Sequence, residues 1–403
     1  MRSRSGRADD RPTRAVRPRI RRSAPLVCGV LVAFAFSAGS RLAADERIVG
    51  LVDGKEIDVT GRVVVEAQDG GVLLETPDGR QWAFDATEIT SRTDDGRPFA
   101  PLDGDGLERE MLRRLGSGFR VHRTQHYVIA YETSEAFAIW TGALFERLLR
   151  GFETYWRQRD IELREPEFPL PVVILGSKAR FDDFSSDVFG GNPGSVVAYY
   201  HLLHNEVVLY DITEADQESS DGRRRSNADQ INALLSQPRA YALVATIVHE
   251  ATHQVAYNLG MQRRLADVPM WINEGIATFF ETPDLRSRSG WRGIGAINTI
   301  RMPQLQQDLA RRKAGAIERL LDGDERFRNG ETILEAYAES WGLVYYLAKV
   351  RKEDFAAYLR DLQQLEPLGQ ESPEERIALF RRHFGDDLEG LDREFRRYME
   401  RQR

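Results

Sequence analysis

The side chains best suited to chemistry in this 403-residue chain gather in one short stretch, in which His249 and Glu250 are followed by His253. The stretch lies within residues 241–259, whose apolar positions predict a buried helix that ends at Gly260. At about 100° per residue the two histidines project from nearly the same face, one turn apart, so both imidazoles can reach one Zn²⁺ at about 2.0–2.1 Å. Glu250 is rotated off that axis and can take a proton from a water held at the metal instead of ligating.

A further carboxylate, Glu274, follows His253 after 21 residues, in the sequence Trp-Ile-Asn-Glu-Gly-Ile-Ala. It begins a second helix-like run, residues 274–281, after the helix-breaking Pro269. Two histidines and one glutamate leave a fourth tetrahedral position open for water, which is the arrangement of catalytic rather than structural zinc. The alternative is a helix whose histidines share a face by coincidence. The two motifs together favour a site for one Zn²⁺ per chain.

The pair of motifs, His-Glu-x-x-His and Asn-Glu-Gly-x-Ala, resembles the gluzincin metallopeptidases. It is similar to the peptidase MA-like group, which includes exported bacterial members of uncharacterised function. The resemblance spans roughly residues 119–403, specific at the zinc motifs and looser around them. It implies that His249, His253 and Glu274 are the zinc ligands, that Glu250 is the general base, and that the reaction is hydrolysis of a peptide bond.

Related enzymes place a tyrosine on a downstream helix, where its hydroxyl supports the oxyanion. Tyr337, which lies 63 residues beyond Glu274, is the first candidate for this role, and Tyr345 is the second. A phenol can donate a hydrogen bond to charge that develops only in the transition state. The alternative is an amphipathic helix that buries its aromatic residues. That alternative stays open for Tyr337 and is preferred for Tyr345 and Tyr346.

The chain departs from the gluzincin aminopeptidases, which carry a Gly-x-Met-Glu-Asn segment upstream of the zinc helix. The corresponding region here is a predicted hairpin, residues 196–210, which can pair with an extended substrate by strand addition. This difference favours an endopeptidase. We interpret His201 and His204, near the hairpin turn, as solvated histidines. Asn273 and Thr278 can orient the metal ligands, or can serve as a helix cap or packing residue.

The elements that must position these residues predict an α+β protein. Short strand-like runs separated by turn signals in residues 45–100 predict a small SH3-like, β-barrel-like module, and residues 101–118 are interpreted as a linker. Residues 119–403 are predicted to form the zinc peptidase domain, with a strand–helix–strand start, an antiparallel edge hairpin, a polar loop at 214–238 and a mainly helical C-terminal half. The first strand, helix and second strand are expected at 126–131, 135–159 and 170–175.

Residues 1–44 predict an export signal. They carry ten Arg against two Asp, a net charge of +8, and include an apolar run at residues 26–36 that is followed by small residues. That run is too short for a stable membrane span. We expect a signal peptide cleaved between about Ala38 and Asp45, or an uncleaved signal anchor, and a periplasmic or extracellular protein. The only cysteine, Cys28, lies in this leader, so a metal site in the mature chain must use histidine and carboxylate ligands.

Charge and composition narrow the remaining choices. The total charge of −7 leaves −15 for residues 45–403, which argues against nucleic acid as a general partner. With 41% hydrophobic and 30% charged residues the chain is an ordinary globular protein.

The sequence therefore predicts a zinc endopeptidase that acts on a peptide or protein. The alternatives are a zinc hydrolase of another amide, such as one in the cell wall, and a non-catalytic metal-binding domain of the cell envelope. The intact Glu250 argues against the last.

Overall fold

The computed structural model describes residues 44–52, 54–213, 228–282, 285, 291 and 293–402. These residues form two compact units, 44–102 and 103–402. Apart from Ala44, the predicted leader lies outside the described residues, as does the 214–227 part of the predicted polar loop. Among the helices that the structure describes, none combines the length and the apolar character needed to cross a bilayer.

The first unit is an antiparallel sheet with the strand order β4-β3-β2-β1-β5. Its strands are β1 (Ala44–Val52), β2 (Lys55–Glu66), β3 (Val72–Glu75), β4 (Gln81–Phe84) and β5 (Ile89–Pro98). A small core of Ile48, Val72, Leu74 and Phe84 joins β1, β3 and β4. The antiparallel module is as predicted, but the closed barrel is not found among the described strands. Closure needs a ladder between the two edge strands, whereas β5 pairs with β1 and the four-residue β4 pairs with β3.

The second unit begins with a helix where we predict a linker. Helix α1 (Gly104–Leu115) starts at Asp103, whose side chain accepts a hydrogen bond from the backbone N–H of Gly106 at 2.7 Å. Leu107 and Met111, one turn apart, are buried. The Asp- and Gly-rich start of this segment suggests a flexible chain, but an aspartate in this position satisfies the free N–H groups of a helix N-terminus.

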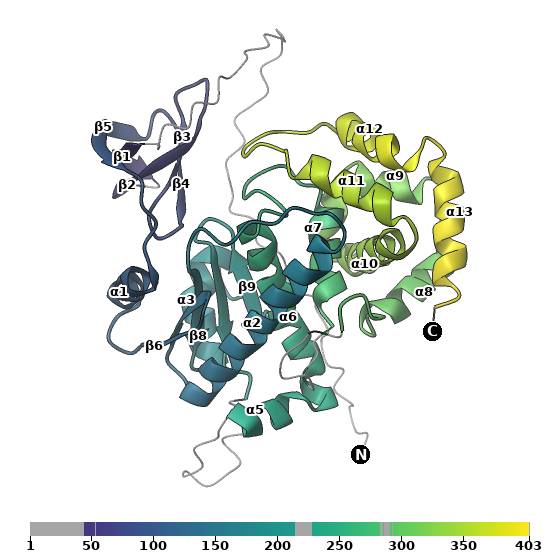
Figure 1. The fold of residues 1–403 in the computed structure, drawn as a ribbon, viewed down its shortest axis with the longest axis horizontal. Coiled ribbons are helices and arrows are strands. Elements are labelled where there is room, and N and C mark those ends of the chain that lie inside the picture. Colours follow the sequence, from purple (N-terminus) through teal and green to yellow (C-terminus); the bar gives the residue numbers. More distant parts are fainter. Residues whose placement is uncertain are drawn as a thin grey trace, which may run out of the picture. The chain divides into compact units, whose positions relative to one another are not determined.

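The centre of the second unit is a mixed sheet with the order β6-β7-β8-β10-β9. Figure 1 labels its strands β6, β8 and β9. Its strands are β6 (Arg120–Arg123), β7 (Tyr127–Tyr131), β8 (Leu170–Leu175), β9 (Ala198–His201) and β10 (Glu206–Tyr210). The central strands β7, β8 and β10 are parallel, while β6 and β9 pair antiparallel at the two edges. The predicted antiparallel edge hairpin is therefore confirmed as β9–β10.

Helices cover both faces of this sheet, as the fully buried β7 and β8 require. Helices α1, α2 (Glu135–Arg157), α3 (Lys178–Phe189) and α6 (Pro238–Asn258) contact its strands, while α5 (Ala228–Leu235) packs against α2 and α6. Tyr199 packs against Phe181 of α3, while the next residue, Tyr200, stacks on Tyr257 of α6. Because consecutive strand residues point to opposite faces, α3 and α6 lie on opposite sides of β9. Helix α5 lies within the 214–238 stretch that we predict to be a loop.

The C-terminal half is helical, as predicted, and its helices surround α10. They are α7 (Met270–Phe280), α8 (Arg301–Arg311), α9 (Ala316–Leu321), the 3₁₀ helix η1 (Glu325–Phe327), α10 (Ile333–Val350), α11 (Lys352–Leu362), α12 (Pro373–Phe384) and α13 (Leu388–Met399). Helix α7 packs between α6 and α10. This packing brings the helix with the two histidines next to the helix with the third candidate ligand.

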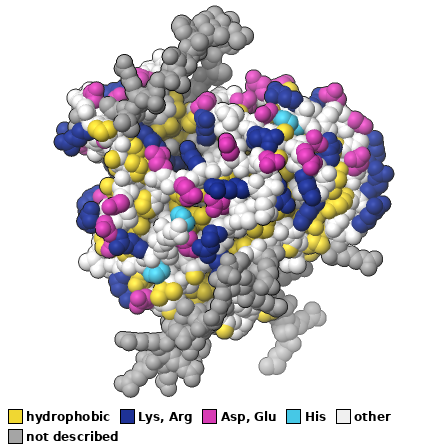
Figure 2. Space-filling model, in the orientation of Figure 1, with side chains coloured by type: hydrophobic (Ala, Val, Ile, Leu, Met, Phe, Trp, Pro, Cys, Tyr) yellow, Lys and Arg dark blue, Asp and Glu magenta, His cyan; other side chains and the backbone are white. Residues whose placement is uncertain are grey.

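Charged side chains of both signs share the surface drawn in Figure 2. Several exposed ones form ion pairs, including Arg263 with Glu366 and Arg381 with Glu318, each at 2.7 Å. Exposed pairs of this kind contribute little to stability. We interpret these charges as a solvated surface, whereas the candidate metal ligands are buried side chains of α6 and α7.

Candidate metal centre

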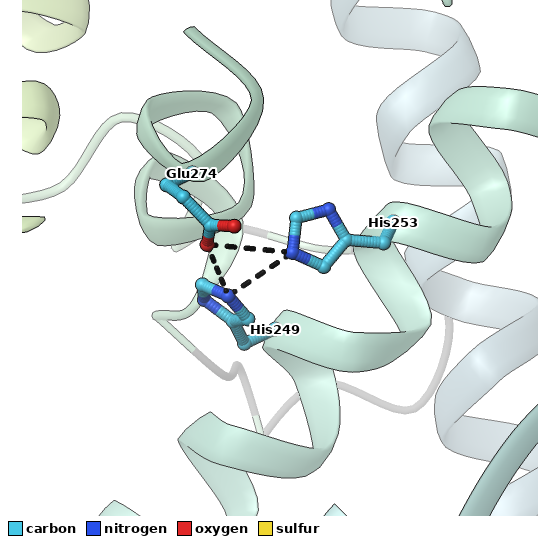
Figure 3. Close-up of side chains that lie close together, drawn as sticks. All are labelled: His249, His253 and Glu274. Atoms are coloured by element: carbon cyan, nitrogen blue, oxygen red, sulfur yellow. Dashed lines mark hydrogen bonds and ion pairs between the residues drawn. The ribbon is translucent and has the colours of Figure 1, made fainter. Parts of the chain in front are cut away.

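Three side chains from two helices point their donor atoms at one another (Figure 3). His249 and His253 come from consecutive turns of α6, and their Nε2 atoms lie 3.2 Å apart. Oε2 of Glu274, from α7, lies 3.1 Å from Nε2 of His249 and 3.5 Å from Nε2 of His253. The three residues are only 4%, 6% and 1% exposed, so bulk water does not compete for these atoms. The cluster can hold a metal ion.

The second ring nitrogen of His249 has its own partner. Nδ1 lies 3.0 Å from Oε2 of Glu281, the C-cap residue that directly follows α7. An ionised carboxylate can only accept, so Nδ1 carries a proton, and when the ring is neutral Nε2 can present its lone pair to a metal ion. A carboxylate behind a metal-ligating histidine fixes the orientation of the ring and raises its basicity. Glu281 therefore favours the ligand form of His249.

The charges of the cluster favour a cation at its centre. Burial alone would lower the pKa of His249, but hydrogen bonds to Glu274 and Glu281 raise it to about 10. Burial would raise the pKa of Glu274, yet the charge of His253 and the hydrogen bond with His249 hold it well below its ordinary value. A buried anion is stable only with a positive partner. A metal ion can take the place of the proton that otherwise charges His249.

Glu250 stands beside the cluster rather than in it. It is half-buried, and its Oε2 accepts a hydrogen bond from the backbone N–H of Tyr200 in β9 at 2.9 Å. Burial raises the pKa of its carboxyl, an effect that the charges of His249 and His253 oppose. A carboxylate with a raised pKa is a better proton acceptor near neutral pH. The one-residue offset from His249 thus turns Glu250 off the axis of the ligands, and its carboxylate bonds to the edge strand β9.

Tyr337 of α10 also reaches the cluster. Its ring centroid lies 6.0 Å from that of His249, and the residue is 3% exposed. Burial, the charges of Glu274 and Glu250 and a hydrogen bond to Glu274 raise the pKa of its hydroxyl well above the ordinary value. The hydroxyl therefore stays protonated at neutral pH and can donate a hydrogen bond.

The other candidate residues near the ligands differ in their contacts. The hydroxyl of Thr278 donates to the backbone oxygen of Glu274 at 2.7 Å, so it bonds to its own helix. The side-chain oxygen of Asn273 is buried and has no hydrogen-bond partner among the described residues. Tyr345 packs against Trp341, with ring centroids 5.4 Å apart, and is a core residue. Tyr345 therefore follows the packing alternative.

The two hairpin histidines are less solvated than predicted. The rings of His201 and His204 stack with centroids 3.8 Å apart, and Nδ1 of His201 accepts a hydrogen bond from the backbone N–H of His204 at 3.1 Å. Burial lowers the pKa of His201 to about 3, so this ring is neutral. The pair closes the β9–β10 turn.

Sequence reasoning missed Glu281, although a signal for it exists. Glu281 follows Glu274 by seven residues, which is two helical turns and returns to nearly the same face. Arg301 and Asn298, which hold Glu281 in place, carry no such signal. The path of the loop between α7 and α8 brings them to Glu281, and a loop has no regular sequence spacing from which such a contact can be predicted.

One comparison with known proteins covers this centre. Residues 243–369 match the model of a family described as "Protein of unknown function (DUF1570)". The matched range runs from α6 to just beyond α11 and contains every residue of the centre from His249 to Tyr337, but not Tyr200. No curated protein matches the chain. Over these residues, which are less than half of its length, the chain is similar to that family.

Proposed function

We propose that residues 103–403 form a zinc-dependent endopeptidase. The observation that carries the proposal is the buried convergence of His249, His253 and Glu274, with the carboxylate of Glu250 beside them at the edge of the sheet. Three protein ligands leave one tetrahedral position free, which is what a catalytic zinc site requires. A purely structural site would use a fourth protein ligand and would have no need of a base.

The spacing of the donor atoms supports zinc. In a tetrahedral shell with bonds of about 2.0–2.1 Å, two ligand atoms are separated by about 3.3 Å. The three separations here are 3.1, 3.2 and 3.5 Å. Two imidazole nitrogens and one carboxylate oxygen suit zinc better than the hard cations Mg²⁺ and Ca²⁺, which prefer oxygen ligands.

The residues around the cluster divide the work of peptide hydrolysis. A bound zinc ion would polarise the scissile carbonyl and lower the pKa of the attacking water. Glu250 accepts the proton of that water and then delivers it to the leaving amine. Tyr337 donates a hydrogen bond to the oxygen that becomes negative in the transition state. Burial of His249 and Glu274 keeps competing water away from the ligands.

The edge strand supports an extended substrate held along its backbone. β9 lies at the edge of the sheet, and the N–H of Tyr200 already reaches the base. A peptide added beside β9 would run past Glu250 with its chain continuing in both directions. Neither substrate terminus is needed for that arrangement, which favours cleavage inside a chain over removal of terminal residues.

The test is cleavage of peptides blocked by N-acetyl and C-amide groups, with the zinc-loaded full chain. We expect internal cleavage that a chelator abolishes and added zinc restores. Cleavage of only free-ended peptides would contradict the endopeptidase assignment. If blocked and free peptides both stay intact while a cell-wall amide is hydrolysed, the alternative zinc hydrolase holds. Zinc binding without any hydrolysis would favour the non-catalytic domain.

We also infer that the protein acts outside the cytoplasm. The support is the basic and apolar pattern of residues 1–44. A peptidase that acts on peptide segments without needing a free end would threaten cytoplasmic proteins, so export is consistent with the proposed activity.

A further inference from the structure

One arginine contacts two different parts of the candidate centre. Arg301 is the first residue of α8, and its side chain is 15% exposed. Its Nε donates to Oε1 of Glu281 at 2.9 Å, and a terminal nitrogen donates to Oε2 at 3.2 Å. Asn298 donates to Oε1 of the same carboxylate at 3.0 Å. Glu281, 2% exposed, is thus held in one orientation, with Oε2 facing Nδ1 of His249.

The same guanidinium group lies over an aromatic ring. Its central carbon is 5.2 Å from the ring centroid of Tyr337, within the range of a cation–π contact. The ring of Tyr337 in turn lies 6.0 Å from the ring of His249. His249, Glu281, Arg301 and Tyr337 therefore form a closed circuit of contacts. Its members come from α6, the end of α7, the start of α8 and α10.

We propose that Arg301 is a positioning residue that fixes the metal ligand His249, through Glu281, and the ring of Tyr337 with a single guanidinium group. This inference rests on the proposed peptidase function. A guanidinium group suits both tasks because its edge presents parallel N–H donors to a carboxylate while its face stacks on an aromatic ring. A lysine carries the charge but lacks the planar fork. The planar guanidinium group of Arg301 then fixes the position of His249 relative to the ring of Tyr337.

The first measurement is the metal affinity of purified full-length variants, by competition with a chromophoric zinc chelator. R301Q and E281Q should each weaken zinc binding by about 10–100-fold, as loss of a carboxylate partner of a ligand does. The variant that carries both R301Q and E281Q should bind zinc no more weakly than the single variant with the lower zinc affinity, because both changes remove the same support of His249. Additive losses, or unchanged affinity in folded R301Q, would overturn the link to His249.

The chain supplies a matched control on the same helix. Arg312, at the other end of α8, is 3% exposed, pairs with Glu339 and Asp392, and lies 5.1 Å from the ring of Phe395. R312Q thus removes a buried arginine with two carboxylate partners and an aromatic neighbour, away from the metal ligands. It should lower stability but leave zinc affinity unchanged. If R312Q and R301Q lost zinc affinity equally, the loss in R301Q would reflect general destabilisation of the fold, and the proposal would be refuted. If the glutamine variants do not fold, R301K and R312K make the same comparison.

The contact between Arg301 and the ring of Tyr337 can be tested without measuring turnover. With 3-fluorotyrosine at position 337, the ¹⁹F resonance of the zinc-loaded protein should move or broaden in R301Q and stay in place in R312Q. An unchanged resonance in R301Q would overturn this part of the proposal. Where a substrate is available, R301Q at saturating zinc should lower kcat by up to about 100-fold, the scale of a misplaced catalytic group, with little change in KM. If the proposed function fails and no peptide is cleaved, the zinc and ¹⁹F measurements still decide the positioning role.

Discussion

The backbone N–H of Tyr200 donates a hydrogen bond to Oε2 of Glu250 across 2.9 Å, and this bond joins the edge strand β9 to helix α6. The same tyrosine is held twice more, by its hydroxyl on Asn205 at 2.8 Å and by its ring on Tyr257. Asn205 in turn exchanges hydrogen bonds with Asn258 of α6. The position of Glu250 relative to β9 is therefore set by this polar network.

Glu250→Gln should separate base from ligand. The amide keeps the size of the side chain, and the three metal donors are untouched, so zinc content should match the wild type. Loss of the proton acceptor should lower kcat by about 10²–10⁴-fold. Zinc stoichiometry and turnover of a blocked peptide are measured on the same preparation. Near-normal turnover would show that Glu250 is not the base.

Changes at the three ligands should remove the metal. His249→Ala, His253→Ala and Glu274→Gln each leave two of the three donors, and the last also removes the negative charge that favours a cation. We expect about one zinc per wild-type chain by elemental analysis and little in the variants after dialysis against a weak chelator. A wild-type protein that takes up no zinc on reconstitution would refute the site.

Tyr337→Phe should weaken the transition state even when the site is saturated with zinc. Removing one oxyanion donor costs about 10²–10³-fold in kcat, with KM nearly unchanged, and kcat is measured at saturating zinc because the hydroxyl also bonds to Glu274. Tyr345→Phe, on the same helix but in the core, is the control and should leave kcat near the wild-type value. Equal effects of the two substitutions would favour the interpretation of Tyr337 as a packing residue.

The ion pair of His126 with Glu146 should make stability depend on pH. Nδ1 of His126 lies 2.9 Å from Oε2 of Glu146, and this hydrogen bond raises the pKa of the histidine. Because the folded pKa is higher than the unfolded one, the stabilisation is complete below about pH 6.5 and is lost as the pH rises through the folded pKa. His126→Asn should therefore cost about 1.5–3 kcal/mol of unfolding free energy at pH 5.5 and less at pH 8.5. Urea unfolding at both pH values tests this, and a cost that grows with pH would contradict it.

Export predicts a shortened chain in the cell envelope. Expressed with its own leader, the protein should start between about Ala38 and Asp45 when isolated from the envelope or medium. N-terminal sequencing decides the point. Recovery of a chain that starts at Met1 from the soluble cytoplasm would contradict both signal cleavage and anchoring.

The periodicity of the sequence predicts those features of this protein that are set within a single helix or strand. The 3.6-residue repeat of a helix places His249 and His253 on one face and turns Glu250 aside. Alternating and continuous apolar runs mark β8 and the β9–β10 hairpin, and Pro269 marks the entry to α7. These features follow from backbone geometry within a few residues, so the sequence alone predicts them.

Only the tertiary structure decided what depends on packing between elements. Whether Tyr337 faces the ligands or the core is set by how α10 lies against α7, not by its own helix, and Arg301 reaches Glu281 only because the chain folds back after α7. In the first unit, barrel closure depends on whether β4 and β5 meet, which no local pattern specifies. Contacts between residues far apart in the chain depend on how the apolar faces of whole helices and sheets are buried against one another. The sequence therefore pointed to His249, His253 and Glu274 as candidate metal donors and to Glu250 as a candidate base, while the packing of the helices decided which other side chains contact them.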